Sequence, residues 1–154
     1  MSIAEIRDSG AEQMDQEEIG QFLREQGVGV LALADRDVPY ALPLSFGYDG
    51  ESRLYFTYLL FGAQSKKEDL SERVERARFL VYSAESMHEW RSVLLTGDLG
   101  EVPDEDWNEL RMAMENAWHP NLFSAATPMR GIKGYKLNIS DITSLKHVGG
   151  GDRS

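Results

Sequence analysis

The stretch PYALPLSFGYDGESRLYFTYL at residues 39–59 has the pattern of two strands joined by a tight turn. Large side chains alternate with smaller ones in its first half, at Tyr40, Leu42, Leu44 and Phe46. This period of two is typical of a strand with one buried face. DGES at 49–52 is a hairpin signal, and RLYFTYL at 53–59 returns as the next strand. The stretch therefore predicts an antiparallel sheet.

Four further segments read as strands. They are VGVLALA at 28–34, RFLVYSA at 78–84, EWRSVLLTGDLGEVP at 89–103 and GIKGYKLNISDITSLKH at 131–147. Each is rich in β-branched, aromatic or alternating apolar residues. Gly97 and Gly100 interrupt the third of these segments, which suggests bulges or bends such as those of a barrel. We therefore expect six strands in all.

Three helices interrupt the strands. The first is expected to begin at Asp15, with Glu18 completing a capping box, and to end at Gly27. The second follows residues 61–65 and runs to about Arg76. The third occupies 104–118 with Asp104 as its N-cap, and its apolar face carries Trp107, Leu110, Met114 and Trp118. Hairpin-length links and few helices predict a mainly β fold, an antiparallel barrel with flanking helices, rather than a parallel dinucleotide-binding fold.

The length of 154 residues suits one domain. We expect a flexible N-terminal arm over 1–14, the folded domain over 15–147 and a flexible tail over 148–154. The chain contains no cysteine, which excludes disulfides, thiolate metal sites and thiol nucleophiles. No apolar run reaches the ~18 residues of a membrane span, and no signal sequence precedes the domain, so we expect a cytoplasmic protein that does not enter a membrane.

The formal net charge is −10, with 26 acidic and 16 basic side chains. Nucleic-acid binding in general needs a basic surface, so this balance argues against it. Two interpretations of the acidity stay open. The chain is either an ordinary acidic protein or one adapted to a salty cytoplasm, where salt screens the repulsion between like charges.

Ser65, Lys66, Lys67 and Glu68 open the second predicted helix. Two of the chain's five lysines are adjacent here, although the positive end of a helix dipole disfavours cations. In one interpretation Ser65 and Glu68 form a capping box and the lysines point into water. In the other, free N–H groups, a hydroxyl and two ammonium groups bind a phosphate monoester.

The strand before this helix places Tyr55 and Thr57 on one face and Phe56 and Tyr58 on the other. These aromatic side chains either fill the barrel or border a flat heteroaromatic ligand whose phosphate reaches the helix. Other chemistry has little support. The three histidines lack metal-ligand spacing, so we expect no metal site, and no G-x-S-x-G motif indicates a serine hydrolase.

The chain resembles the FMN-binding split-barrel family related to pyridoxamine 5′-phosphate oxidase. The resemblance lies in two segments and their order, RDVPYALPLSFGYDGESRLYFTYLLFGAQSKKEDLSERVERARFLVY followed by EWRSVLLTGDLGEV. The shorter branch, with nitroimidazole-resistance-type flavoproteins, is the most similar. The resemblance covers about residues 27–147. It implies a six-stranded antiparallel split β-barrel that forms a homodimer with FMN at the subunit interface. A barrel this small fills its own interior, so a ligand as large as FMN needs a groove between two of them.

The resemblance also implies which residues contact the cofactor. The flavin ring would lie against Leu44, Ser45 and Phe46, largely through their backbone groups. The ring or ribityl chain would run beside Phe56, Thr57 and Tyr58. The phosphate would be held by Ser65, Lys66 and Lys67, with Lys66 as the principal contact. Trp90, Arg91 and Ser92 match a segment near the subunit boundary, where Arg91 is a candidate second cation.

The implied function is that of an FMN-dependent oxidoreductase with an unknown small-molecule substrate. Catalytic side chains are not identified, and the electron donor is a reduced nicotinamide or a deazaflavin. The chain departs from the vitamin B6 oxidases, because the arginine and histidine residues of their longer C-terminal region have no counterpart after Lys146 and His147. The alternatives are a split barrel that binds deazaflavin F420 or haem, and a non-enzymatic flavin-binding or sensing module.

Overall fold

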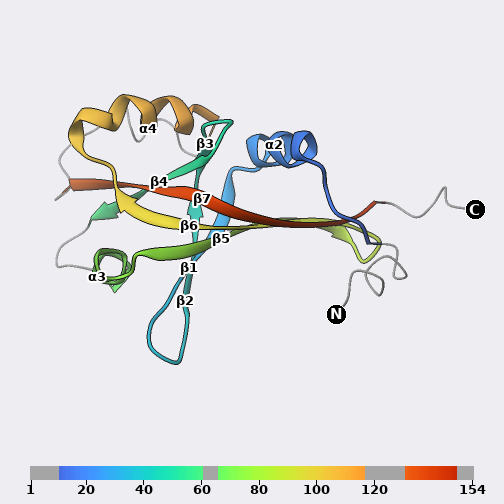
Figure 1. The fold of residues 1–154 in the computed structure, drawn as a ribbon, viewed down its shortest axis with the longest axis horizontal. Helices are drawn as coiled ribbons and strands as arrows, with labels where there is room; N and C mark the ends of the chain where they lie inside the picture. Colours follow the sequence, from blue (N-terminus) through green and yellow to red (C-terminus); the bar gives the residue numbers. More distant parts are fainter. Residues whose placement is uncertain (1–10, 61–65, 117–130, 149–154) are drawn as a thin grey trace, which may run out of the picture.

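The structure, a computed structural model, describes residues 11–60, 66–116 and 131–148. Its helices are α2 (Gln16–Glu25), α3 (Lys66–Arg73) and α4 (Trp107–Ala113), the last flanked by the 3-10 turns η1 (Asp104–Asp106) and η2 (Met114–Asn116). Its strands are β1 (Val28–Leu33), β2 (Tyr40–Ser45), β3 (Gly47–Tyr48), β4 (Arg53–Leu60), β5 (Arg76–Ser86), β6 (Glu89–Glu101) and β7 (Gly131–His147). Figure 1 shows the three helices around one strongly twisted sheet.

All the strands belong to one antiparallel sheet in the order β2-β1-β5-β6-β7-β4-β3. The two edge strands, β2 and β3, come from a single segment that divides at Phe46. One piece of chain therefore occupies both edges and closes the sheet into a split barrel. The prediction of a mainly β split barrel is confirmed, but the described residues form seven strands rather than the predicted six, because the predicted strand 39–48 is broken at Phe46.

Aromatic side chains fill the barrel. Phe46 meets Phe79 edge to face with ring centroids 5.3 Å apart, and Phe56 stacks on Phe79 at 5.7 Å. At the other end of the core, the rings of Tyr58 and Tyr135 are 4.7 Å apart. Each of these side chains is almost wholly removed from water, and each such aromatic buries a large apolar area. The aromatic pattern of the sequence therefore marks the interior of the barrel.

The predicted turn at 49–52 is confirmed. The Asp49 carboxylate accepts hydrogen bonds from the backbone N–H groups of Glu51, Ser52 and Arg53 at 2.8, 2.9 and 3.0 Å. Gly50 has a φ of +89°, a conformation that glycine adopts without strain. The turn fixes β3 against β4 and so sets one edge of the barrel.

The capping box of α2 is also confirmed. Asp15 accepts a hydrogen bond from the Glu18 backbone N–H at 2.8 Å, and the Glu18 side chain accepts from the Asp15 N–H. Glu18 also forms an ion pair with Lys146 on β7. Phe22 and Leu23 are buried against the sheet, so α2 is held over the extended part of β6 and β7 (Figure 1).

Residues 11–14, the described part of the predicted arm, are paired with β7. Glu12 and Lys146 exchange backbone hydrogen bonds of 2.9 and 2.8 Å. The backbone N–H of Met14 donates to the buried Ser144 hydroxyl at 3.0 Å. This part of the arm is therefore fixed to the sheet, although the sequence shows no periodic pattern there.

The predicted helix at 104–118 begins differently from the prediction. Asp104 is not an N-cap, because residues 104–106 form the turn η1 and no side-chain cap bond forms at either η1 or α4. Leu110 and Met114 pack with Tyr55 and Val102 in a small cluster on the outside of the barrel, so the predicted packing face is present. Trp118 lies outside the described residues.

A β-bulge changes the register between β6 and β7. Thr96 pairs with Asp141 and Gly97 pairs with Ile139, which leaves Ser140 as the extra residue. The side chain of Ser140 accepts a hydrogen bond from Arg76 at 2.9 Å and donates to the Thr96 carbonyl at 3.2 Å. The bulge predicted near Gly97 is present, whereas the register around Gly100 is regular.

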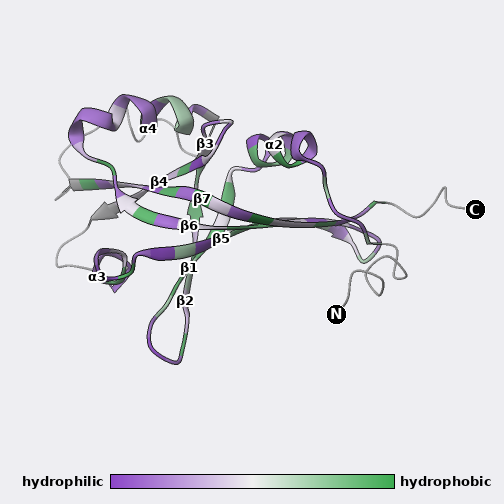
Figure 2. Cartoon of the chain, viewed as in Figure 1, coloured by the Kyte–Doolittle hydropathy of each residue, from purple (hydrophilic) through white to green (hydrophobic). Residues whose placement is uncertain are grey.

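On the outer face of the sheet α4 packs over Tyr55 and Gly134, and a second part of this face, over β1, β5, β6 and the end of β7, has no described helix packed on it. Side chains on it include Val30, Leu80, Tyr82, Leu94 and Leu145, which alternate with the buried residues of their strands. Tyr82 is 57% exposed and the others are half-buried. Figure 2 shows green, hydrophobic residues along β1 and hydrophilic ones on the connection from β1 to β2. None of the described helices is both long and apolar enough to cross a bilayer.

Gly97→Ala is expected to destabilise the fold by about 1–3 kcal/mol, as overpacking of a tight contact does. A Cβ atom at this position would lie 2.0 Å from the Asn138 carbonyl oxygen. Urea denaturation followed by circular dichroism measures the loss. Gly100→Ala is the matched control on the same strand, because a Cβ there meets nothing within 4 Å. Equal stabilities of the two variants would contradict the role given to Gly97.

Candidate functional site

The first turn of α3 carries the lysines that the sequence singles out. Leu70 is buried against the core and anchors the helix at the end of the barrel. Lys66 is the first residue of α3, and Lys67 follows it. Ser65, the predicted cap and phosphate contact, lies outside the described residues. The remaining geometry therefore depends on the two lysines and their neighbours.

Lys66 points toward the connection between β1 and β2. Its ammonium forms an ion pair of 2.8 Å with Asp35 and lies 5.9 Å from the centre of the Tyr40 ring. The hydrogen bond from Lys66 holds the pKa of Asp35 below its usual value. The Lys66 side chain is 58% exposed, so its ammonium is accessible to an anion from solvent.

Lys67 is tied to the barrel core. Its ammonium lies 5.3 Å from the centre of the Tyr58 ring, and its backbone carbonyl accepts a hydrogen bond from the Ser71 hydroxyl at 2.6 Å. The Ser71 and Tyr58 oxygens are also 2.6 Å apart. A serine hydroxyl has one proton and a carbonyl only accepts, so Tyr58 is the donor in this second bond.

Glu68 faces inward, away from the two lysines. The residue is 3% exposed, and its carboxylate forms an ion pair of 2.8 Å with Lys133 on β7. Lys133 also contacts Glu72 at 2.7 Å, and these two carboxylates raise the pKa of its ammonium. The negative charge of Glu68 is therefore compensated on the β7 side, and the pair fixes α3 to the sheet.

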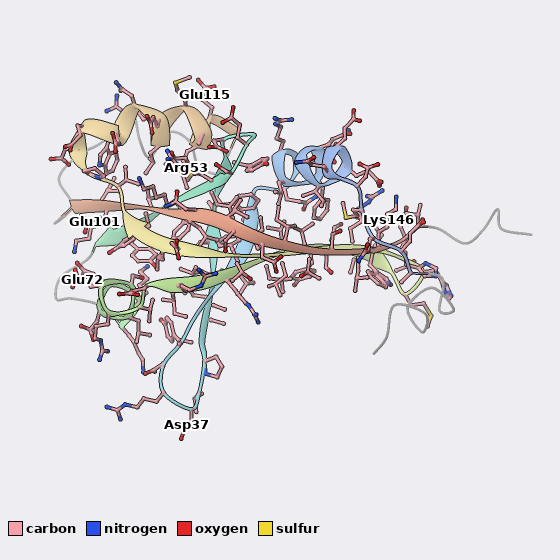
Figure 3. All side chains as sticks on the ribbon, viewed as in Figure 1. Asp37, Arg53, Glu72, Glu101, Glu115 and Lys146 are labelled. Atoms are coloured by element: carbon pink, nitrogen blue, oxygen red, sulfur yellow. The ribbon has the colours of Figure 1, made fainter. Side chains whose placement is uncertain are left out.

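A concave surface that encloses a volume of about 780 Å³ lies between α3 and the β1–β2 connection. Its lining is Asp35, Arg36, Asp37, Val38, Lys66, Asp69 and Arg73. Three cations and three carboxylates therefore border it, and two pairs of them are ion pairs of 2.8 Å, Lys66 with Asp35 and Arg73 with Asp69. Figure 3 places Asp37 at the tip of the β1–β2 connection.

Sequence reasoning missed Asp35, Arg36 and Arg73 as members of this site. The local pattern DRDV indicates only a turn, and Arg36 has a φ of 56° there. The contact between this turn and α3 joins residues about thirty positions apart, and only the way the hairpin folds brings them together. The sequence carries no signal for that contact.

The predicted ring contacts on β2 differ in exposure. Leu44 and Ser45 are half-buried, whereas Phe46 is 1% exposed and belongs to the core. The side chain of Phe46 is therefore occupied inside the barrel, and its backbone N–H donates to the Gly27 carbonyl at 3.2 Å, so neither group is free for a ligand. Within the described chain β2 is an edge strand, so half of its backbone polar groups point away from β1.

The predicted contacts on β4 are divided in the same way. Phe56 and Tyr58 are fully buried core residues. Thr57 lies on the opposite face of the strand, is half-buried, and pairs with Gly134. Of these three residues, Thr57 alone presents a side chain that a ligand can reach.

Trp90, Arg91 and Ser92 lie at the other end of the sheet, where β6 pairs with the last residues of β5 and β7. Ala84, the partner of Trp90, is eight residues beyond Arg76 at the start of β5, which corresponds to roughly 26 Å of extended strand. Figure 1 shows this hairpin on the side of the molecule opposite α3. One chain therefore does not bring the two groups of predicted contacts together.

Alkaline pH tests the buried phenol that holds α3. Burial raises the pKa of Tyr58 to about 12, partly offset by the bond to Ser71. The contribution of this neutral phenol to the free energy of unfolding is fully present at pH values below the unfolded-state pKa of about 10. It is lost as the pH rises through about 12. The free energy of unfolding of the wild type should therefore fall more steeply over that interval than that of Tyr58→Phe, by at most about 1.4 kcal/mol per pH unit.

Urea titrations at several pH values measure the two slopes. Parallel curves for the wild type and Tyr58→Phe would show that this phenol does not couple proton binding to folding.

A family model described as pyridoxamine 5′-phosphate oxidase matches residues 15–145, most of the chain. No curated protein matches it significantly. Among the described residues, no three histidine or acidic side chains are arranged to hold a metal ion.

Solved structures share the fold at low identity. An FAD-binding protein from Mesorhizobium loti superposes with a TM-score of 0.67 and 22% identity, over 88% of this chain and 97% of that one. An FAD and haem binding protein from Mycobacterium smegmatis superposes with a TM-score of 0.68 and 18% identity, over 92% of this chain and 74% of that one. A candidate 5-nitroimidazole antibiotic resistance protein from Bacteroides thetaiotaomicron superposes with a TM-score of 0.65 and 16% identity, over 89% of both chains.

Proposed function

Since the chain belongs to the pyridoxamine 5′-phosphate oxidase family, we propose that it binds a flavin, with FMN as the first candidate, and acts as an oxidoreductase on a small molecule. The observation that carries the proposal is the accessible ammonium of Lys66, which stands over a concave surface beside the edge strand β2. Two similar structures named for FAD binding support a flavin, and one of them is also named for haem binding.

The phosphate would bind where Lys66 meets the concave surface. Its ion pair with Asp35 is partly exposed, so a doubly charged phosphate can compete for the ammonium. Arg36 and Arg73 border the same surface as two further cations, while Asp37 and Asp69 also line it and Asp69 pairs with Arg73. The donor set therefore fits a phosphate ester, with Asp35 as a competing anion that has to be displaced or shared.

The flavin ring would lie along β2. Ala41 and Pro43 are exposed on this strand, and Pro43 lacks the N–H that would let another strand extend the edge. Leu44 and Ser45 are half-buried beside them. A flat ring can bond to the outward backbone groups of this edge, and Thr57 offers a hydroxyl from β4.

We propose further that two chains form a homodimer with the flavin between them. The uncovered face around Tyr82 and Leu94 supplies an apolar surface for a second copy. Trp90 and Arg91 lie far from Lys66 in one chain, so the two groups can touch one flavin only if they come from different subunits. A two-fold axis would generate two such sites in each dimer.

When bound, a flavin supplies hydride or electron transfer between a reductant and a substrate. The residues named here would hold its phosphate, orient its ring and exclude water. We assign no catalytic side chain, since positioning the ring needs no acid–base dyad. A cytoplasmic location is part of the proposal, because a chain without cysteine needs no oxidising compartment.

Lys66→Ala is expected to weaken FMN binding at least about tenfold, because a charge-assisted hydrogen bond to the phosphate is lost. Fluorescence quenching during titration of the apoprotein measures the affinity. Riboflavin, which has no phosphate, should bind the variant and the wild type equally. Asp35→Asn is expected to bind FMN at least as tightly as the wild type. An unchanged FMN affinity in Lys66→Ala would remove the phosphate assignment.

Tyr82→Arg is expected to convert the dimer to a monomer, because it places a charge in the proposed apolar interface. Light scattering after size-exclusion chromatography gives the mass, and absorbance gives the retained flavin, which should fall with it. Met112→Arg changes a side chain that is 73% exposed on α4, away from this face, and should leave the dimer intact. A monomeric wild type would contradict the proposal.

The cofactor itself is tested by purification without added flavin. A yellow protein with flavin absorbance supports the proposal, and chromatography of the acid-released compound distinguishes FMN from FAD. A haem or deazaflavin spectrum would replace FMN by one of those cofactors. Bound FMN that no reductant or substrate turns over would instead indicate a binding or sensing module.

A further inference from the structure

The phenol of Tyr135 has an unusual position at the end of the barrel. The residue is 1% exposed, and its hydroxyl has no hydrogen-bond partner in the part of the chain that the structure describes. Buried polar groups almost always have a partner. The adjacent Tyr58, whose ring centre is 4.7 Å away, does have one in Ser71. Among the described residues, the Tyr135 hydroxyl therefore has no counterpart to the hydrogen bond that Tyr58 makes.

Tyr135 lines a cavity of about 640 Å³ between the end of α3 and the ends of β6 and β7. Four carboxylates surround the same cavity, those of Glu72, Glu75, Asp98 and Glu101, together with the apolar side chains of Val74 and Leu99. Lysine and arginine do not occur among its described lining residues. Figure 3 shows Glu72 and Glu101 at the same end of the molecule, one on α3 and the other at the end of β6.

Neighbouring cations compensate only part of this charge. Lys133 contacts Glu72 at 2.7 Å, and Arg76 contacts Asp98 at 3.0 Å. Neither Glu75 nor Glu101 makes a side-chain ion pair with any described residue. The cavity thus combines excess negative charge with one buried hydroxyl.

The chemistry of these groups selects the occupant. Burial raises the pKa of the Tyr135 phenol, which therefore stays neutral and can accept a hydrogen bond. The described acidic residues form no cluster suited to a metal ion. A ligand with N–H donors and a positive charge satisfies both the phenol and the carboxylates, and a short aliphatic chain would pack against Val74 and Leu99.

We propose that this cavity binds a small primary amine in its ammonium form. One N–H donates to Tyr135 Oη, and Glu75 and Glu101 balance the charge. The site is separate from the concave surface at Lys66, because the two linings have no residue in common. The proposal does not depend on the flavin.

Titration of the full-length protein with n-butylammonium chloride tests the site. The readout is chemical-shift change at constant ionic strength, with NaCl making up the balance, so that general attraction to an acidic protein is held constant. Saturable shifts of cavity residues are expected. Tyr135→Phe should weaken binding about tenfold, as expected for the loss of a hydrogen bond to a charged group.

Three controls make the result decisive. Glu101→Gln should also weaken binding, and because Glu101 is exposed it tests the site even if Tyr135→Phe does not fold. Glu115→Gln removes an exposed carboxylate from η2, outside the cavity, and should have no effect. Tetramethylammonium has the charge without an N–H donor and should not bind. Equal binding of the two cations, or wild-type affinity in both Tyr135→Phe and Glu101→Gln, would overturn the proposal.

Discussion

Phe46 marks the point where one extended segment passes from one edge of the sheet to the other. Its buried ring packs on Phe79, and β2 and β3 diverge on either side of it. The barrel closes because this segment serves both edges, and the aromatic core is enclosed as a result. Closure also leaves the outer side of β2 as a free edge next to α3, which is where the proposed flavin site lies.

The placement of α3 depends on two sets of polar contacts with that core. Tyr58 donates to Ser71, which donates to the Lys67 carbonyl, and Glu68 pairs with Lys133. Both sets are at least partly shielded from solvent, so loss of one partner would leave a buried polar group unsatisfied, and together they orient the first turn. Lys66 thereby faces outward while the neighbouring acidic side chain faces the sheet.

Local chemistry in the sequence predicted the parts of the fold that depend on few neighbours. The Asp15–Glu18 capping box, the Asp49 turn and the alternating strands follow from residues close together in the chain. The break at Phe46 and the pairing of Asp35 with Lys66 depend on closure of the whole sheet, so no local pattern indicates them. Aromatic residues on β4 illustrate the limit, since Phe56 and Tyr58 suit a ligand site or a core equally well by pattern, and burial shows that they form the core.

The extra residue at Ser140 changes which side chains of β7 face the core. Before Ser140, odd-numbered side chains such as Leu137 point into the core, whereas beyond it the even-numbered Ser144 does. One strand can thus line the barrel at one end and lie under α2 at the other, with Leu145 on the uncovered face. Most single substitutions in β7 alter one contact, whereas loss of a residue on either side of the bulge would exchange the two faces of the strand beyond it. Insertions and deletions should therefore be much rarer here in natural variants than changes of residue type.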